Sequence, residues 1–139
     1  MSDEQADILA ANAAFYTAFA KRDLTAMQTL WASSDEIACI HPGWGCLTGR
    51  EQVMESWQAI LNNPDSPVIT STEESVHMFG DAAFVTCGEA IEGDRPQLIA
   101  TNYFVKTDAG WKLLHHHASP LIQDADIQSD SGPPSDQLH

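Results

Sequence analysis

Hydrophobic and polar positions along the chain follow two periods, one typical of helices and one typical of strands. Between residues 8 and 19, apolar side chains recur at helical spacing, after a capping sequence that begins at Ser2. This spacing predicts a helix from about Asp3 to Arg22. A second helix is expected over 24–32 and a third over 48–61, because apolar residues line one face of each segment.

The remaining apolar segments are short, are bounded by turn residues and predict strands. They cover 36–41, 68–78, 82–91, 98–106 and 111–120. Helices come first and a mostly antiparallel sheet follows, which is typical of the α+β class. We expect the sheet to curl around the long first helix, giving a cone-shaped domain with an open end.

The last strand carries three consecutive histidines, and strand alternation decides which of them share a face. Regular alternation puts Trp111, Leu113, His115 and His117 on one face and Lys112, Leu114 and His116 on the other. Two histidines of the three can therefore point into one pocket. We expect His115 and His117 to bind the ligand, while which of the three histidines face the pocket stays open, and one of them could instead form a hydrogen bond at a subunit interface.

Composition narrows the classes of partner. The chain has 139 residues and a formal net charge of −14, which disfavours nucleic acid and anionic membranes as partners. Three cysteines without paired spacing, no signal peptide and no membrane-spanning run predict a cytoplasmic protein with reduced thiols. We expect one domain over 1–122, followed by an acidic, polar tail over 123–139.

Several short motifs, in this order, are shared with a known superfamily. They are Asp23-Leu24 after the first helix, Gly49-Arg50-Glu51 at the start of the third, and Trp-x-x-x-His-x-His-x-Ser over 111–119. Over about residues 4 to 122 the chain resembles the nuclear transport factor 2-like superfamily. This superfamily includes SnoaL-like proteins, ketosteroid isomerase, scytalone dehydratase and the association domain of calcium/calmodulin-dependent protein kinase II. The resemblance implies a cone-shaped homodimer around a small-molecule pocket.

Ketosteroid isomerase indicates where that pocket lies. Its catalytic base precedes a proline at the end of the first strand, where this chain has His41-Pro42. Its second aspartate corresponds to Asn102, and its tyrosine to Phe15, with Tyr16 one step away. All three positions depart from the isomerase, so steroid isomerisation is not predicted. The association domain has a pocket arginine where this chain has Asn102, so its anion binding does not carry over.

Two of these residues have chemistry suited to proton transfer. A histidine at position 41 could act as a general base, since its pKa lies near working pH. Asn102 could donate amide hydrogens to a developing oxyanion. Together they predict an isomerase, dehydratase or cyclase. The alternative is that both residues only line the pocket or form structural hydrogen bonds.

Other side chains are predicted to bind the ligand: Phe15, Tyr16, Trp44, Trp57, His115 and His117. Trp44 stands between two glycines and could cover the pocket mouth, or it could be a hydrophobic plug or a dimer contact. Trp57 has helical spacing, which is also typical of core residues. His41, His115 and His117 could hold a metal, but nothing completes the ligand shell, so we expect no metal and no cofactor.

Four further residues are expected to have no part in the chemistry. Glu89 could face the cavity, but a solvated outer face is expected. Cys39, Cys46 and Cys87 are expected to be packing residues without an activating base. The sheet has more apolar surface than three helices can cover, which predicts a homodimer through its outer face. Two functions remain open at this point. One is a small-molecule enzyme with His41 as base, and the other is a non-catalytic ligand-binding or oligomerisation module.

Overall fold

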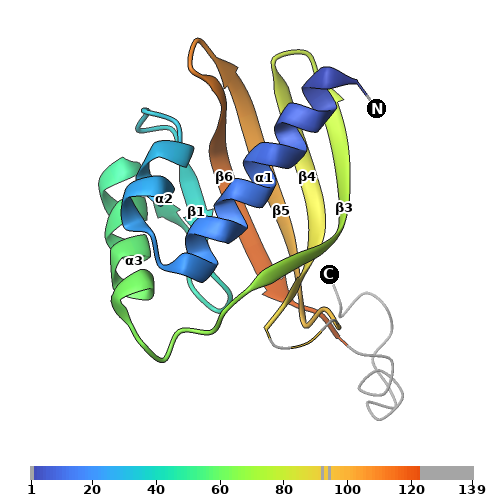
Figure 1. Cartoon of the computed structure of the whole chain (residues 1–139). Coiled ribbons are helices and arrows are strands. Elements are labelled where there is room, and N and C mark those ends of the chain that lie inside the picture. The colour runs from blue at the N-terminus through green and yellow to red at the C-terminus, as the bar shows by residue number, and fades with distance from the viewer. Residues whose placement is uncertain (1, 92, 94, 123–139) are drawn as a thin grey trace, which may run out of the picture.

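The protein is described here by a computed structural model that covers residues 2–91, 93 and 95–122. The predicted polar tail over 123–139 lies outside these described residues. The described residues form three helices and one six-stranded sheet (Figure 1). The helices are α1 (Asp3–Lys21), α2 (Leu24–Leu30) and α3 (Arg50–Asn62). The strands are β1 (Ala38–Ile40), β2 (Leu47–Thr48), β3 (Thr70–Phe79), β4 (Ala82–Ala90), β5 (Leu98–Thr107) and β6 (Gly110–Pro120).

Helix α1 begins and ends within one residue of the prediction. Ser2 and Gln5 form a capping box that satisfies backbone donors of the first turn. The helix stops where Arg22 adopts a left-handed conformation with φ of 56°. The Arg22 guanidinium then donates to the carbonyl oxygens of Asn63 and Ser66, at 2.5 and 2.6 Å, which ties α1 to the segment after α3. None of the described helices is long and apolar enough to cross a bilayer.

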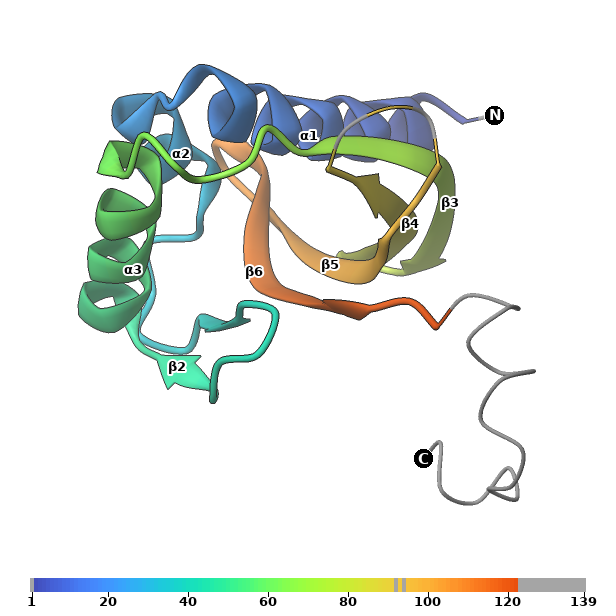
Figure 2. The same cartoon turned by 90° about the horizontal axis from the view of Figure 1, so that it is seen from below.

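The sheet has the order β2-β1-β6-β5-β4-β3. Among the named strands of the described residues, only β1 and β6 pair in parallel, so the predicted α+β fold with a mostly antiparallel sheet is confirmed. Helix α1 crosses the concave side of the sheet, while α2 and α3 lie toward the edge formed by β1 and β2 (Figure 2). Strand β2 was not predicted, because two residues are too few to show a period.

The face predicted for the three histidines is wrong, because β6 contains a β-bulge. Leu113 pairs with Phe104 and His115 pairs with Tyr103, so Leu114 is an extra residue without a partner on β5. An extra residue reverses the alternation for everything that follows. His116 therefore joins the buried inner face, whereas His117 is exposed and His115 is half-buried.

Candidate functional site

Several polar side chains are buried in the core between the helices and the inner face of the sheet. We define the buried polar cluster as Asn12, Tyr16, His41, Ser56, Glu89, Asn102 and His116, all at most 6% exposed. Helix α1, helix α3 and strands β4, β5 and β6 supply most of these residues, and His41 follows β1. Buried polar groups destabilise a fold unless they are hydrogen-bonded. The hydrogen-bond partners in this cluster therefore indicate which atoms donate and which accept.

His41 is held in one tautomer by α3. Its Nε2 lies 2.9 Å from Ser56 Oγ, and Ser56 Oγ donates to the carbonyl oxygen of Val53 at 2.7 Å. A hydroxyl has one hydrogen, which is used on Val53, so His41 Nε2 must donate to Ser56. The other ring nitrogen, Nδ1, is then unprotonated and is the basic atom of the side chain.

Burial also keeps the His41 ring neutral. The side chain is 4% exposed, and this burial lowers the pKa of His41 to about 4. The ring lies edge-on to Trp57 and Trp44, at centroid distances of 4.8 and 4.9 Å. Trp44 itself is 47% exposed and follows Gly43, whose φ is +82°. Trp44 therefore packs against the predicted base from an exposed position, and its role at a pocket mouth stays a prediction.

Asn102 is bonded at every polar atom of its side chain. Its Oδ1 accepts from His116 Nδ1 at 2.5 Å. Its Nδ2 donates to Asn12 Oδ1 at 2.9 Å and to the Tyr16 hydroxyl at 3.1 Å, which uses both amide hydrogens. Donation to an oxyanion, as predicted from the sequence, would require one of these bonds to break. In this geometry Asn102 holds three other side chains in place.

His116 and Glu89 belong to the site although neither was predicted to. Glu89 is 2% exposed, contrary to the expected solvated face, and the Tyr16 hydroxyl donates to its Oε2 at 2.6 Å. His116 Nε2 lies 4.0 Å from the same oxygen. Burial lowers the pKa of His116 to about 3, helped by the nearby histidines. Burial likewise raises the pKa of Glu89, although the bond from Tyr16 opposes this rise. Both effects favour the uncharged forms.

The predicted ligand-binding residues divide into two groups. Phe15 and Trp57 are fully buried and contact His116, with ring centroids 5.0 and 6.0 Å from it. Tyr16 belongs to the cluster, so Tyr16, and not Phe15, supplies the hydroxyl beside Asn102. The structure does not bring His115 and His117 together with these residues, because the bulge places both on the outer side of the sheet.

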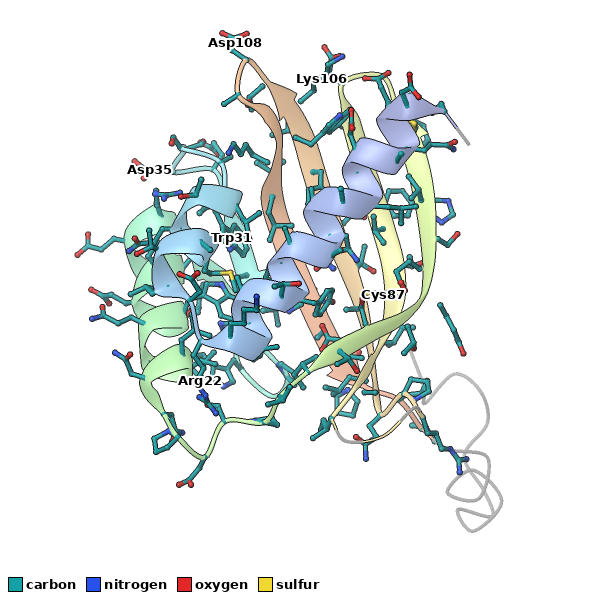
Figure 3. All side chains as sticks on the ribbon, viewed as in Figure 1. Arg22, Trp31, Asp35, Cys87, Lys106 and Asp108 are labelled. Carbon is teal, nitrogen blue, oxygen red and sulfur yellow. The ribbon has the colours of Figure 1, made fainter. Side chains whose placement is uncertain are left out.

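The three cysteines have unequal environments. Cys39 and Cys87 are buried, as expected of packing residues, but Cys46 is exposed. Burial raises the pKa of both inner thiols, that of Cys87 to about 11. Cys87 lies on β4 where α1 crosses the sheet, and its Sγ is 3.3 Å from the Tyr16 hydroxyl (Figure 3). Thiols that stay protonated are poor nucleophiles, so Cys39 and Cys87 do not suit nucleophilic catalysis.

Two surface hollows lie outside the buried polar cluster or at its edge. One of about 800 Å³ lies between α2 and the β5–β6 hairpin and contains none of the predicted site residues. Its two cations, Arg50 and Lys112, already donate to backbone carbonyl oxygens. A smaller hollow of about 420 Å³ lies between α1 and β3, and Asn12 is part of its lining. Because Asn12 accepts from Asn102, this hollow reaches the edge of the buried polar cluster.

Known proteins are similar to this chain in sequence and in fold. The SnoaL-like domain family matches residues 8–123. The F-box protein SKIP8 of Arabidopsis thaliana is 30% identical over 117 residues, which are 84% of this chain and 51% of the plant protein. The chain thus spans about half the length of that curated relative.

Solved structures agree with the family match. An NTF2-like family protein of Streptomyces avermitilis, provisionally named a dehydratase, is 35% identical with a TM-score of 0.74, over 84% of this chain and 95% of its own. A Thiobacillus denitrificans protein, provisionally identified as a calcium/calmodulin-dependent protein kinase type II association domain, is 33% identical with a TM-score of 0.70, over 81% and 94%. The CaMKII hub of S. rosetta is 25% identical with a TM-score of 0.65, over 83% and 95%. With its cone of sheet around α1 and its match over 8–123, the chain belongs to the SnoaL-like domain family, within the NTF2-like fold.

Proposed function

We propose that this protein is a small-molecule enzyme of the isomerase, dehydratase or cyclase type, in which His41 is the general base. One observation carries the proposal. His41 is buried and neutral, and its bond to Ser56 leaves Nδ1 as the basic nitrogen, with the Cys39 Sγ 4.0 Å away. A thiol is a weak donor, so a contact to sulfur at 4.0 Å leaves Nδ1 able to accept a proton. A general base requires both features.

An unpaired donor next to His41 supports ligand binding at the same place. Trp57 Nε1 is buried and has no hydrogen-bond partner, although a buried indole N–H normally finds an acceptor. The Trp57 ring also packs against His41 and His116. A carbonyl oxygen of a bound molecule is the kind of acceptor this donor lacks.

These groups suggest a reaction on a carbonyl compound. Movement of the Trp44 loop would expose the ring of His41. The Nδ1 atom would then take a proton from the carbon next to the carbonyl group, while a hydrogen bond from the Trp57 indole stabilises charge on the carbonyl oxygen. Ser56 would hold the imidazolium that forms, through Nε2. The fold alone does not select this chemistry, so the proposal stands on these residues.

The proposal is tested by solvent isotope exchange. A panel of uncharged ketones would be incubated in D₂O with the protein, and deuterium at the carbon next to the carbonyl would be measured by mass spectrometry. His41→Gln keeps a donor for Ser56 but has no base, so exchange should fall by at least about a hundredfold. Gln58→Ala, at an exposed position on α3, is the control and should exchange as wild type. Equal exchange by His41→Gln, or none by the wild type, would remove the enzymatic proposal.

A second candidate function is assembly, and the outer face of the sheet favours it. His77, Phe84, Tyr103 and His115 form one cross-strand row over β3, β4, β5 and β6. Neighbouring rings in this row lie 4.5, 5.2 and 5.9 Å apart, and Tyr103 is 41% exposed. Such a row suits self-association into the predicted homodimer or a hub like that of the relatives. We also keep the prediction of a cytoplasmic location, which suits the three free thiols.

A further inference from the structure

Four side chains of the buried polar cluster form a nearly closed ring of hydrogen bonds. His116 donates to Asn102 at 2.5 Å, Asn102 donates to Tyr16 at 3.1 Å, and Tyr16 donates to Glu89 at 2.6 Å. The ring has one gap, 4.0 Å wide, between Glu89 Oε2 and His116 Nε2. The gap is too wide for a direct hydrogen bond.

The hydrogen bonds around the ring determine which donor and acceptor atoms face the gap. An amide oxygen only accepts, so His116 Nδ1 carries the hydrogen and His116 Nε2 presents a lone pair to the gap. On the other side of the gap stands the Glu89 carboxyl group. When that group is protonated, the gap has a donor on one side and an acceptor on the other.

Charge near the ring is low. All six lysines and arginines are exposed or half-buried, so none of them shares the core with Glu89. Lys106 pairs with Glu4 at the surface, and Arg22 and Arg50 donate to backbone carbonyl oxygens. Without a buried cation, an ionised Glu89 would lack a counter-charge other than His116 itself. Burial raises the pKa of Glu89 and lowers that of His116, which agrees with a neutral pair.

We propose that Glu89 is a second catalytic residue, a carboxylic acid, and that a substrate hydroxyl group fills the gap between it and His116. A hydroxyl both accepts and donates one hydrogen bond, so it would accept from Glu89 and donate to His116 Nε2. Two bonds of about 2.8 Å can meet at one oxygen when their outer atoms are 4.0 Å apart. With the carbonyl contact at Trp57, the substrate class is an uncharged β-hydroxy carbonyl compound. This proposal rests on His41 acting as base.

The corresponding reaction is elimination of water. His41 Nδ1 takes the proton from the carbon between the carbonyl and the carbinol, and that electron pair forms the new double bond. The carbon–oxygen bond breaks, and Glu89 gives its proton to the departing hydroxyl, which leaves as water. The protonated His41 returns its proton to the Glu89 carboxylate, and His116 lies between them, with its ring centroid 6.4 Å from that of His41. The products are an α,β-unsaturated carbonyl compound and water.

Three small probes of one size test the class of substrate. Diacetone alcohol is the uncharged β-hydroxy ketone, methyl isobutyl ketone lacks its hydroxyl, and β-hydroxyisovalerate has a carboxylate in place of the ketone. Binding to the full chain would be measured by ligand-detected NMR. Diacetone alcohol should bind about thirtyfold more tightly than methyl isobutyl ketone, since its hydroxyl makes two hydrogen bonds of about 1 kcal/mol each, and it should also bind more tightly than the anion. Equal or tighter binding of the anion, or no binding of diacetone alcohol, would overturn the proposed class.

The variant Glu89→Gln distinguishes the proposed role of Glu89 as acid from that of His41 as base. Glutamine has the shape of the neutral acid but no proton to give. This variant should keep deuterium exchange into diacetone alcohol while formation of mesityl oxide falls by at least about a hundredfold. Glu55→Gln, exposed on α3, is the matched control. Infrared difference spectra between wild type and Glu89→Gln at neutral pH should show the carbonyl stretch of a protonated acid. If that carbonyl stretch is absent, or if Glu89→Gln eliminates water as fast as wild type, Glu89 is not the acid. Deuterium exchange by the wild type would still support His41 as the base in that case.

Discussion

The two buried histidines should make the stability of this protein depend on pH in a way that one substitution can isolate. His41 has a pKa of about 4 in the folded protein, whereas a histidine in the unfolded chain has about 6.5. The unfolded state therefore binds more protons in this window. His41 contributes its full stabilisation above pH 6.5, and that contribution is lost as the pH falls toward 4.

The size of this effect follows from the same two pKa values. One pKa unit corresponds to about 1.4 kcal/mol, so the loss of unfolding free energy reaches about 3 kcal/mol at pH 4 and is already about 2 kcal/mol at pH 5. His116, with a pKa of about 3, adds a similar loss over the same window. Glu89 affects stability in the opposite direction. Its pKa is raised because the fold favours the protonated form, so its contribution to the unfolding free energy falls as the pH rises.

Comparing wild type with His41→Gln cancels the terms that both proteins share. Urea unfolding would be followed by far-UV circular dichroism at pH 7 and pH 5, because Trp57 fluorescence would report on residue 41 directly. The drop in unfolding free energy from pH 7 to pH 5 should be about 2 kcal/mol smaller in His41→Gln than in wild type. His77→Gln, exposed on β3, should retain the wild-type drop. The same drop in His41→Gln as in wild type would refute the neutral state of His41.

Other substitutions probe the remaining contacts. Ser56→Ala frees the His41 tautomer and removes the buried partner of Nε2, so exchange kinetics should show any activity falling roughly tenfold and calorimetry a stability loss of about 1–3 kcal/mol. Trp57→Phe removes an unpaired buried donor, so it should cost the free protein less than about 1.5 kcal/mol but should weaken ketone binding in the NMR assay. Asn102→Ala removes the partner of His116 Nδ1 and of Asn12 Oδ1 and should cost about 2–5 kcal/mol in urea unfolding; a cost below about 1 kcal/mol would contradict the ring. Tyr103→Asp should turn a sedimenting dimer or larger assembly into monomer, whereas a monomeric wild type would remove the assembly candidate.

The spacing of hydrophobic residues was enough to predict the fold, but it did not predict that His116 is the histidine that faces the core. Helix α1 and strands β3 to β6 were located within about two residues, because long elements repeat their period several times. One extra residue, Leu114, defeats the same rule in β6. Nothing in the local sequence marks that bulge, so His115 and His117 were chosen in place of His116.

Other misses have different physical causes. Glu89 could have been found, since alternation puts it on the same face as Ala83, Val85 and Cys87, all of which are buried. It was expected in solvent because an isolated carboxylate is rarely buried. The tautomer of His41 depends on Ser56, fifteen positions away in the chain. Such long-range pairs have no signature in a single sequence. Position 41 itself was predicted by the resemblance, and its role as a base stays a prediction.

The most direct test of the proposed site is a histidine ring spectrum with and without a ligand. Long-range ¹H–¹⁵N spectra of the full chain would be recorded at neutral pH, alone and with diacetone alcohol. His41 should be neutral with the hydrogen on Nε2, and His116 neutral with the hydrogen on Nδ1. Added ligand should shift His41 Nδ1, His116 Nε2 and the Trp57 indole N–H, and leave His115 and His117 unchanged. Shifts confined to the outer histidines, or a protonated His41 in the free protein, would contradict a proton-transfer site inside the cone.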